Sequence, residues 1–592
     1  MRLSALLPLL LSGLLLQAGG PAPRTFRQWI AGQEVGGSSV VARDEGPDRV
    51  VVSREWLALS RMGQVVRQEL EETARRTPQG RIAFSWRVRL SEDPFEGTAS
   101  WSPEAPGVLR IHPKNGAAQD LPVPPGALLW PEDLDARLQE AARLRRPVQA
   151  TTFSFPTQQW TTVELEPREP APLPGYPDAV HFAGRELEGK AQASLESWIS
   201  PTAGEVRQTS ELGGLSLFMQ RSDLPVPADW STPAAGFFEQ TLQTLPFHPF
   251  LPWLEAVTLR PEGPVPDLPE DAQQRRLPDG RWRMSRATAP TVAEATERPV
   301  QGAPSSPDAP YLAATPLVPY RDPAFEGLVR RMALPPGLGR WELARRVTDF
   351  VFEWITEKDY SVGFASALEV CRHPRGDCTE HGVLAVALLR KLGVPARGVT
   401  GWVALDGTLG LHFWVEVKVG GRWIPVDPTF DQAPASAFRI KLGDTDLADL
   451  GSVGWEGAAT AFLGVRWLPQ DASGRPWGSD LQVAGDRLSA PGGIQLRLPG
   501  ARWTVHAGSL EVQSSLGGPW DVQASLRPDQ AQLRSASLLA GAKTLRKGWW
   551  EPRRSTLWMA LPRGRWLRVE GLTEAAAYLV LDQLSVDPGS GS

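Results

Sequence analysis

Residues 376–430 decide how the whole chain is interpreted, and they read GDCTEHGVLAVALLRKLGVPARGVTGWVALDGTLGLHFWVEVKVGGRWIPVDPTF. The first part of this stretch predicts a helix that begins at Cys378, because leucines recur at a helical spacing from Leu384 to Leu392. Gly393, followed by a proline, is suited to end that helix. A thiol in the first turn of a helix lies at the positive end of the helix dipole, which favours the reactive thiolate.

The second part of the stretch predicts two neighbouring strands. In HFWVEVKV, residues 412–419, apolar residues occupy one set of alternate positions, and His412 belongs to the other set. We expect the apolar set to pack inward, so that the imidazole of His412 faces a cleft. Gly420 and Gly421 predict a hairpin turn, after which the return strand carries Asp427 beside the histidine strand.

Together these residues have the composition of a catalytic centre for acyl transfer. Cys378 would be the nucleophile, His412 the base, and Asp427 the carboxylate that orients the base. Taken singly, a cysteine on an apolar helix is usually a packing residue, and a histidine on a strand is usually structural. Their order and spacing favour the catalytic interpretation.

These motifs resemble the transglutaminase-like superfamily, the rearranged relatives of papain-type cysteine peptidases. The resemblance rests on five blocks of sequence: SALEV (366–370), the cysteine helix (376–397), LHFWVEV (411–417), RWIPVDPTF (422–430) and ASAFRIKL (435–442). It implies an α+β papain/transglutaminase-like catalytic core and a thioester acyl-enzyme on Cys378. We expect no cofactor.

A metal site is the main competing interpretation of the same region. Cys371, His373, Cys378 and His381 are four residues of the kind that bind zinc. A structural zinc site would consume the thiol that the family motif uses, so we predict no metal. We also expect Cys371 and Cys378 to be free thiols, because a disulfide in so short a loop would distort the start of the helix.

Three aromatic residues are predicted to contact the substrate: Trp414, Trp402 and Tyr360. Trp414 lies on the same face of its strand as His412. The backbone N–H of Cys378 is the expected hydrogen-bond donor to the oxyanion. Tyr360 and Trp354 are the candidates for a second donor. Trp423, just before the aspartate strand, is expected to shield the His–Asp pair from water.

Composition limits the possible compartments and partners. The chain has 592 residues and a net charge of −5 without a concentrated basic patch, which argues against a nucleic-acid partner. Residues 1–20 begin with one arginine and continue with an apolar run too short to span a bilayer, as in a secretory signal peptide. We expect no membrane span and an exported protein, periplasmic or extracellular in a bacterium. Two cysteines are too few for a disulfide scaffold.

The length predicts several domains, with the catalytic core flanked by mostly antiparallel β domains. RIAFSWRVRL (81–90) alternates as a half-buried strand does, and PEDLDARLQEAARL (131–144) reads as a helix within a strand-rich region. We divide the chain as follows: signal peptide 1–20, β-rich N-terminal domain 25–235, junction with a small β segment 236–286, Pro-rich exposed linker 287–310, transglutaminase-like catalytic domain 311–470 and C-terminal β domain 471–592.

The sequence therefore predicts an exported cysteine-dependent enzyme that acts on peptide or glutamine-type amides, with hydrolysis slightly favoured over transfer to an amine. Its partner would be a protein or peptide substrate, such as a cell-envelope peptide. The alternative is a non-catalytic envelope scaffold or binding protein that retains the fold. An activated thiol distinguishes the two, because a scaffold does not need one.

Overall fold

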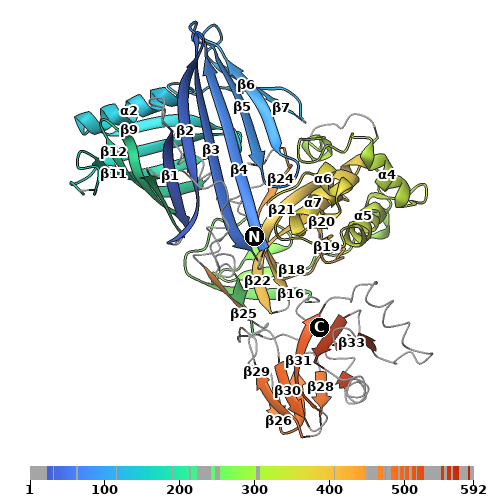
Figure 1. The fold of residues 1–592 in the computed structure, drawn as a ribbon. Coiled ribbons are helices and arrows are strands. Elements are labelled where there is room, and N and C mark those ends of the chain that lie inside the picture. Colours follow the sequence, from blue (N-terminus) through green and yellow to red (C-terminus); the bar gives the residue numbers. More distant parts are fainter. Residues whose placement is uncertain are drawn as a thin grey trace.

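The computed structural model describes residues 23–586 with gaps, the largest of which are 223–241, 451–464, 526–547 and 572–583. The predicted signal peptide lies outside the described residues. A large β domain, a mixed domain of helices and strands, and a smaller β region follow one another along the chain (Figure 1). Among the described residues, no helix is both long and apolar enough to cross a membrane.

The N-terminal domain is one curved antiparallel sheet of 14 strands, in the order β8-β7-β6-β5-β4-β3-β2-β1-β14-β13-β12-β11-β10-β9. Each of its described strands is therefore paired with the next along one path, with β8 and β9 at the two ends. Its strands are β1 (Arg24–Ile30), β2 (Gln33–Glu45), β3 (Asp48–Arg61), β4 (Gln64–Arg76), β5 (Ile82–Arg89), β6 (Phe95–Trp101), β7 (Val108–Pro113), β8 (Gln119–Pro122), β9 (Val148–Ser154), β10 (Gln159–Pro167), β11 (Val180–Glu188), β12 (Ala191–Ser200), β13 (Gly204–Leu212) and β14 (Leu215–Ser222).

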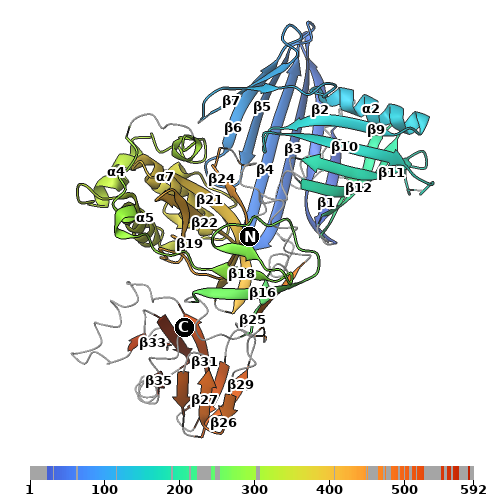
Figure 2. The same ribbon diagram turned by 180° about the vertical axis from the view of Figure 1, so that it is seen from behind.

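Two sequence predictions for this domain are confirmed. Burial alternates strictly along β5, as the pattern of residues 81–90 predicts. The predicted helix forms as α2 (Pro131–Leu144), and its leucines pack with apolar residues of β9 to β12 such as Val163 and Phe182. Figure 2 shows α2 lying along the strands of this second half of the sheet.

The mixed domain places helices against a five-stranded sheet of order β15-β22-β21-β24, with β23 paired to β22. Helix α7 contacts β21 and β22 through the apolar positions of β22, and Phe413 packs so closely on Gly382 that an added Cβ would lie 2.4 Å from the ring. The elements are η4 (Pro310–Leu312), α4 (Ala324–Arg331), α5 (Arg340–Trp354), β19 (Glu357–Lys358), α6 (Ala367–Arg372), β20 (Arg375–Gly376), α7 (Cys378–Lys391), β21 (Ala396–Leu405), β22 (Thr408–Val419), β23 (Arg422–Val426) and β24 (Arg439–Thr445).

The segment predicted as a junction is part of the mixed domain. β15 (Gln243–Thr244) pairs with β22 of the mixed sheet. A second sheet, of order β17-β18-β16-β25, joins β16 (Ala256–Glu262), β17 (Gln274–Arg276) and β18 (Trp282–Ser285) to β25 (Arg466–Gln470). The small β segment predicted for residues 236–286 is present as β16, β17 and β18.

The described residues of segment 287–310, predicted as an exposed linker, are exposed or half-buried apart from Ala287, but they also contact the mixed domain. This segment contains helix α3 (Val292–Ala295) and lies against the mixed domain. Val300 N donates to Gly393 O at 2.8 Å, and the Lys418 ammonium lies 2.6 Å from the Asp308 carboxylate. The prolines and small polar residues of this segment give it no apolar periodicity from which packing could be predicted. Its contacts with the mixed domain are made by single charged side chains and backbone groups.

The C-terminal region consists of two antiparallel sheets, β26-β27-β28-β35 and β29-β30-β31-β34-β33-β32. Its strands are β26 (Gln482–Ala484), β27 (Arg487–Ala490), β28 (Ile494–Arg497), β29 (Arg502–Val505), β30 (Leu510–Ser514), β31 (Gly517–Ser525), β32 (Gly548–Glu551), β33 (Thr556–Leu561), β34 (Arg565–Glu570) and β35 (Leu584–Val586).

The turn between β5 and β6 holds the N-terminal sheet to the mixed domain. The carboxylate of Glu369 on α6 accepts hydrogen bonds from Ser91 Oγ at 2.6 Å and from the backbone N–H groups of Glu92 and Asp93 at 3.2 and 3.3 Å. Gly363 N donates to Leu90 O at 2.7 Å. The turn is thus hydrogen-bonded to Gly363 and Glu369, in the segment that precedes α7.

Candidate active site

The predicted nucleophile lies at the start of α7. Asp377 caps this helix: its side chain accepts from Thr379 N at 3.1 Å, while Glu380 accepts from Asp377 N at 3.0 Å. Cys378 is therefore the first residue of the helix, and its side chain is partly exposed. Gly376 has φ = 134°, and a Cβ there would lie 2.3 Å from Glu380. The turn before the thiol is thus fixed by its own sequence.

The predicted base and its carboxylate meet across the β22–β23 hairpin. The hairpin turn occurs at Gly420 and Gly421, both with positive φ, as predicted. Asp427 follows the end of β23, and His412 Nε2 donates to Asp427 Oδ2 at 2.7 Å. A second hydrogen bond joins His412 to Cys378, which leaves Nδ1 as the ring nitrogen that faces the sulfur. The structure thus brings the three residues together.

Charges around the imidazole favour its protonated form. Burial alone would lower the pKa of His412, but the Asp427 charge, the hydrogen bond to Asp427 and that to Cys378 outweigh it, so the pKa is raised. For Asp427, burial would raise the pKa, but the charges of His412 and Arg439 and the hydrogen bond from His412 hold it well below its usual range. An ionised Asp427 and a readily protonated His412 follow.

Comparison with known proteins agrees with this geometry. Residues 328–428, from α4 to just beyond β23, match the model of the transglutaminase-like superfamily, and the match includes Cys378, His412 and Asp427. These residues form a transglutaminase-like domain. None of the curated proteins matches the chain.

Two solved structures have a low similarity to the chain. One is a β-barrel-like protein of the domain of unknown function DUF1849 from Brucella abortus, with 10% identity, a TM-score of 0.28, and coverage of 35% of this chain and 97% of the other. The second is a "putative cysteine protease" from Cytophaga hutchinsonii, with 14% identity, a TM-score of 0.23, and coverage of 39% and 86%. At these scores neither likeness establishes a shared fold.

One charged neighbour of the site, Arg439, was not predicted from the sequence. This residue begins β24, two strands from His412 in the sheet of the transglutaminase-like domain. Its Nη1 lies 2.7 Å from Asp427 Oδ2, and its Nη2 donates to Gln432 Oε1 at 2.9 Å. The sequence does offer one indication of this role. Arg439 stands between the apolar residues Phe438 and Ile440, and a charged side chain in a buried segment needs a buried partner.

The second histidine near the nucleophile has a structural position. His381 is fully buried on α7. Its Nδ1 donates to Asp377 O at 2.6 Å, and its Nε2 accepts from Lys358 Nζ at 3.0 Å, where β19 pairs with β20. Burial first, and then the Lys358 charge, lower the pKa of His381 well below its ordinary value. With both nitrogens occupied, His381 holds the turn before Cys378 and has no lone pair for a thiol proton.

The face of β22 that was expected to line a cleft is covered. His412 is 4% exposed and Trp414 is 2% exposed, and the ring of Phe430 stacks on the imidazole with centroids 4.8 Å apart. Phe430 therefore shields the pair, a role the sequence analysis gave to Trp423. Trp423 instead packs edge-on against Tyr311.

The predicted substrate residues differ in their surroundings. Trp402 is fully buried beside Trp467, and Trp414 lies under the Arg439 guanidinium, so both indoles are core residues with little surface for a substrate. The prediction for these two is corrected on this ground: strand alternation identified the face but could not show what covers it. Tyr360 is only half-buried, and its backbone N–H donates to Gln64 Oε1 of the N-terminal sheet at 2.6 Å.

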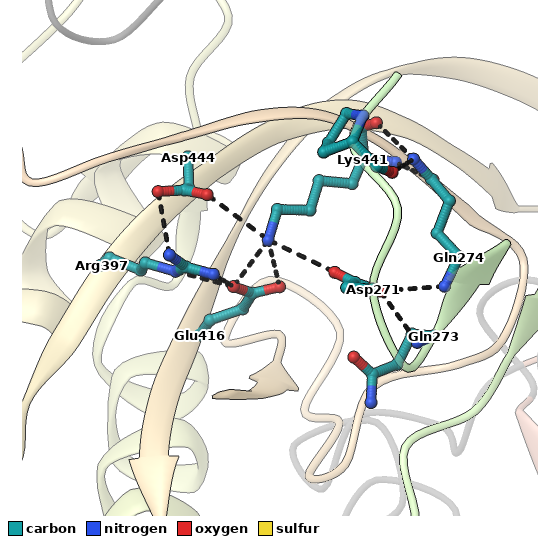
Figure 3. A network of polar contacts seen from close by, with 8 residues as sticks. Asp271, Gln273, Gln274, Arg397, Glu416, Lys441 and Asp444 are labelled. Carbon is teal, nitrogen blue, oxygen red and sulfur yellow. Dashed lines mark hydrogen bonds and ion pairs between the residues drawn. The ribbon is translucent and has the colours of Figure 1, made fainter. Parts of the chain in front are cut away.

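A buried charge network continues along the same face of β22 (Figure 3). The Glu416 carboxylate lies 2.6 Å from Arg397 Nη2 and 3.0 Å from Lys441 Nζ. Gln274 of the junction segment donates to Lys441 O and accepts from Lys441 N, at 2.9 and 2.8 Å. These contacts fix β24 two residues after Arg439, and so hold the arginine that touches Asp427.

The four residues of the zinc interpretation do not converge. Cys371 is buried on α6, and the half-exposed His373 lies 3.9 Å from Glu92. Within the described ranges, no three His, Cys, Asp or Glu side chains are arranged to hold a metal ion. Both cysteines are free thiols.

Proposed function

We propose that this chain is an exported cysteine-dependent acyl-transfer enzyme that acts on peptide or glutamine-type amides. The observation that carries the proposal is the hydrogen-bonded His412–Asp427 pair beside a cysteine at the start of a helix. The transglutaminase-like domain supports it, because that superfamily generally includes cysteine enzymes. The apolar run at residues 3–16 supports export.

The contacts of the candidate site support the following sequence of steps. The Cys378 thiolate attacks the carbonyl carbon of the amide, and the backbone N–H at the start of α7 is placed to stabilise the oxyanion. His412 then gives its Nδ1 proton to the leaving amine as the C–N bond breaks, which leaves a thioester on Cys378. Water or a second amine, deprotonated by His412, attacks the thioester and restores the thiolate. Asp427 keeps the imidazole in one tautomer throughout.

An activated ester tests this chemistry without a known natural substrate. We expect p-nitrophenyl acetate to give a burst of nitrophenolate and an acetyl group on Cys378, detected by intact mass. Cys378→Ala should give no burst, and His412→Ala should lose it as well. Partition of the acetyl group between water and added hydroxylamine then distinguishes hydrolysis from transfer to an amine.

The exposed His373, five residues before the nucleophile, offers a matched control for the loss of a histidine. His373→Ala should keep the wild-type burst. A wild-type protein without a burst, or a His412→Ala variant that acetylates at the wild-type rate, would favour the non-catalytic scaffold and overturn the proposal.

A further inference from the structure

A cavity of about 80 Å³ lies in the N-terminal domain, where β4 and β5 face the end of β9 and the start of α2. It is remote from the candidate active site. Glu72 on its wall is eight residues along β4 from Gln64, the residue that contacts Tyr360. Eight residues of strand correspond to roughly 26 Å. The cavity therefore belongs to a different site.

Aromatic rings form much of its wall. Phe84 and Phe155 lie with ring centroids 4.9 Å apart, and Phe153 and Phe155 lie 5.2 Å apart in an edge-on arrangement. Trp130 completes the set and is held by a hydrogen bond from its Nε1 to Glu132 at 3.0 Å. Rings that are locked by one another and by a hydrogen bond present fixed faces to the cavity.

Glu72 is the acidic residue of this wall. It lies opposite Ser53 and Trp86 in the sheet register. Within the described part of the chain, Glu72 accepts no hydrogen bond and forms no ion pair. Protein surrounds the carboxyl, and burial raises its pKa to about 7, yet the side chain keeps some accessible surface, as a group on a cavity wall does. A carboxyl in such a place lacks a cationic partner.

The described surroundings of the cavity offer little positive charge to Glu72. No lysine or arginine is among the described residues that line the cavity. Glu55, on the neighbouring strand, has a pKa raised well above its ordinary value, by burial and then by the charge of Glu72. The Arg76 guanidinium stacks on the Trp130 ring at 4.4 Å, and Arg76 is not part of the cavity lining.

We propose that this cavity binds a small organic ammonium ion, with the charge on Glu72 and the alkyl part against Phe84, Phe153 and Phe155. The ring faces favour the alkyl part by apolar burial, and the carboxylate attracts the ammonium more strongly where water is excluded. A water molecule needs roughly 10–15 Å³ of such space, so the cavity suits a ligand of about five heavy atoms. The site is independent of the proposed acyl-transfer chemistry.

Calorimetric titration of the full chain with n-butylammonium chloride, and with n-butanol as a neutral ligand of similar size, tests the proposal. We expect butylammonium to bind at least about tenfold more tightly than butanol. Glu72→Gln keeps the shape of the side chain, and the variant should bind the two ligands with about equal affinity. Glu71→Gln is the matched control: it lies next in sequence, its side chain pairs with Arg54, and it should leave both affinities unchanged.

Equal affinities of the wild-type protein for butylammonium and butanol would overturn the proposal, because the cavity would then be an apolar one without charge selectivity. Absence of binding by both ligands would overturn it as well. If Glu72→Gln does not fold, the comparison of the two ligands on the wild-type chain still decides the outcome.

Discussion

The Asp427 carboxylate is buried between two basic side chains, His412 and Arg439, each 2.7 Å from the same oxygen. Its other oxygen accepts from Thr429 N at 2.9 Å. Asp427 thus orients the imidazole and at the same time neutralises a guanidinium that is almost completely buried. Removal of the carboxylate charge should affect chemistry and stability together.

Asp427→Asn should lower the acetylation rate on the order of a hundredfold, because the amide no longer fixes the tautomer. It should also destabilise the fold by about 3 kcal/mol at pH 7, because Arg439 remains buried without its counter-charge. The depressed pKa of Asp427 means that its stabilising contribution is complete above the unfolded-state pKa of about 4 and decreases as the pH falls below it.

Urea unfolding at pH 7 and at pH 3 measures this difference. The wild-type protein should lose more stability between the two pH values than Asp427→Asn does. Asp120→Asn, which removes an exposed partner of Arg110, should behave like the wild-type protein. Parallel loss in all three proteins would show that Asp427 does not carry the expected ionised pair.

Single helices and turns were predicted correctly where their structure depends on residues that are close in sequence. The start of α7 at Cys378 and the Gly420–Gly421 hairpin depend on residues a few positions apart, and both form as predicted. Helix α2 has the predicted bounds for the same reason: a proline opens it and its apolar stripe is complete. The three predicted catalytic residues lie on such elements.

The predictions failed where contacts join distant parts of the chain. Strand alternation placed Trp402 and Trp414 correctly on their strands, but it could not show that Trp467 and Arg439 would cover them. The pairing of Arg439 with Asp427 depends on β24 lying beside β21, which nothing in the local pattern specifies. Whether the polar face of a strand is buried can therefore be predicted only when the order of strands in the sheet is known. Local sequence patterns do not specify that order.

At the scale of the whole molecule, the N-terminal sheet contributes to the candidate site. Its β5–β6 turn binds Glu369, and Gln64 binds the backbone of Tyr360. Both contacts hold the segment 358–376, which carries Lys358 and ends two residues before the nucleophile. We expect this docking to keep the wall of the site in place for substrate.

Glu369→Gln places an amide opposite three donors and should loosen the docking. Acetylation should slow by about fivefold, since small displacements of catalytic groups are costly. Hydrogen exchange should become faster in residues 358–376 and remain unchanged in α7. The exposed Glu353→Gln on α5 is the control and should alter neither quantity. Wild-type exchange and rate in Glu369→Gln would show that the N-terminal sheet is a separate module.

The central claim is that Cys378 is a thiolate activated by His412, and the rate of its alkylation by dilute iodoacetamide tests this most directly. At pH 6, Cys378 should react at least about tenfold faster than in the unfolded chain, because an ordinary thiol, with a pKa of about 8.5, is mostly protonated there. His412→Ala should remove this advantage. Cys371, whose thiol pKa is raised by burial, serves as the internal control and should react slowly. Peptide mapping that finds Cys378 no more reactive than in the unfolded chain would contradict the account.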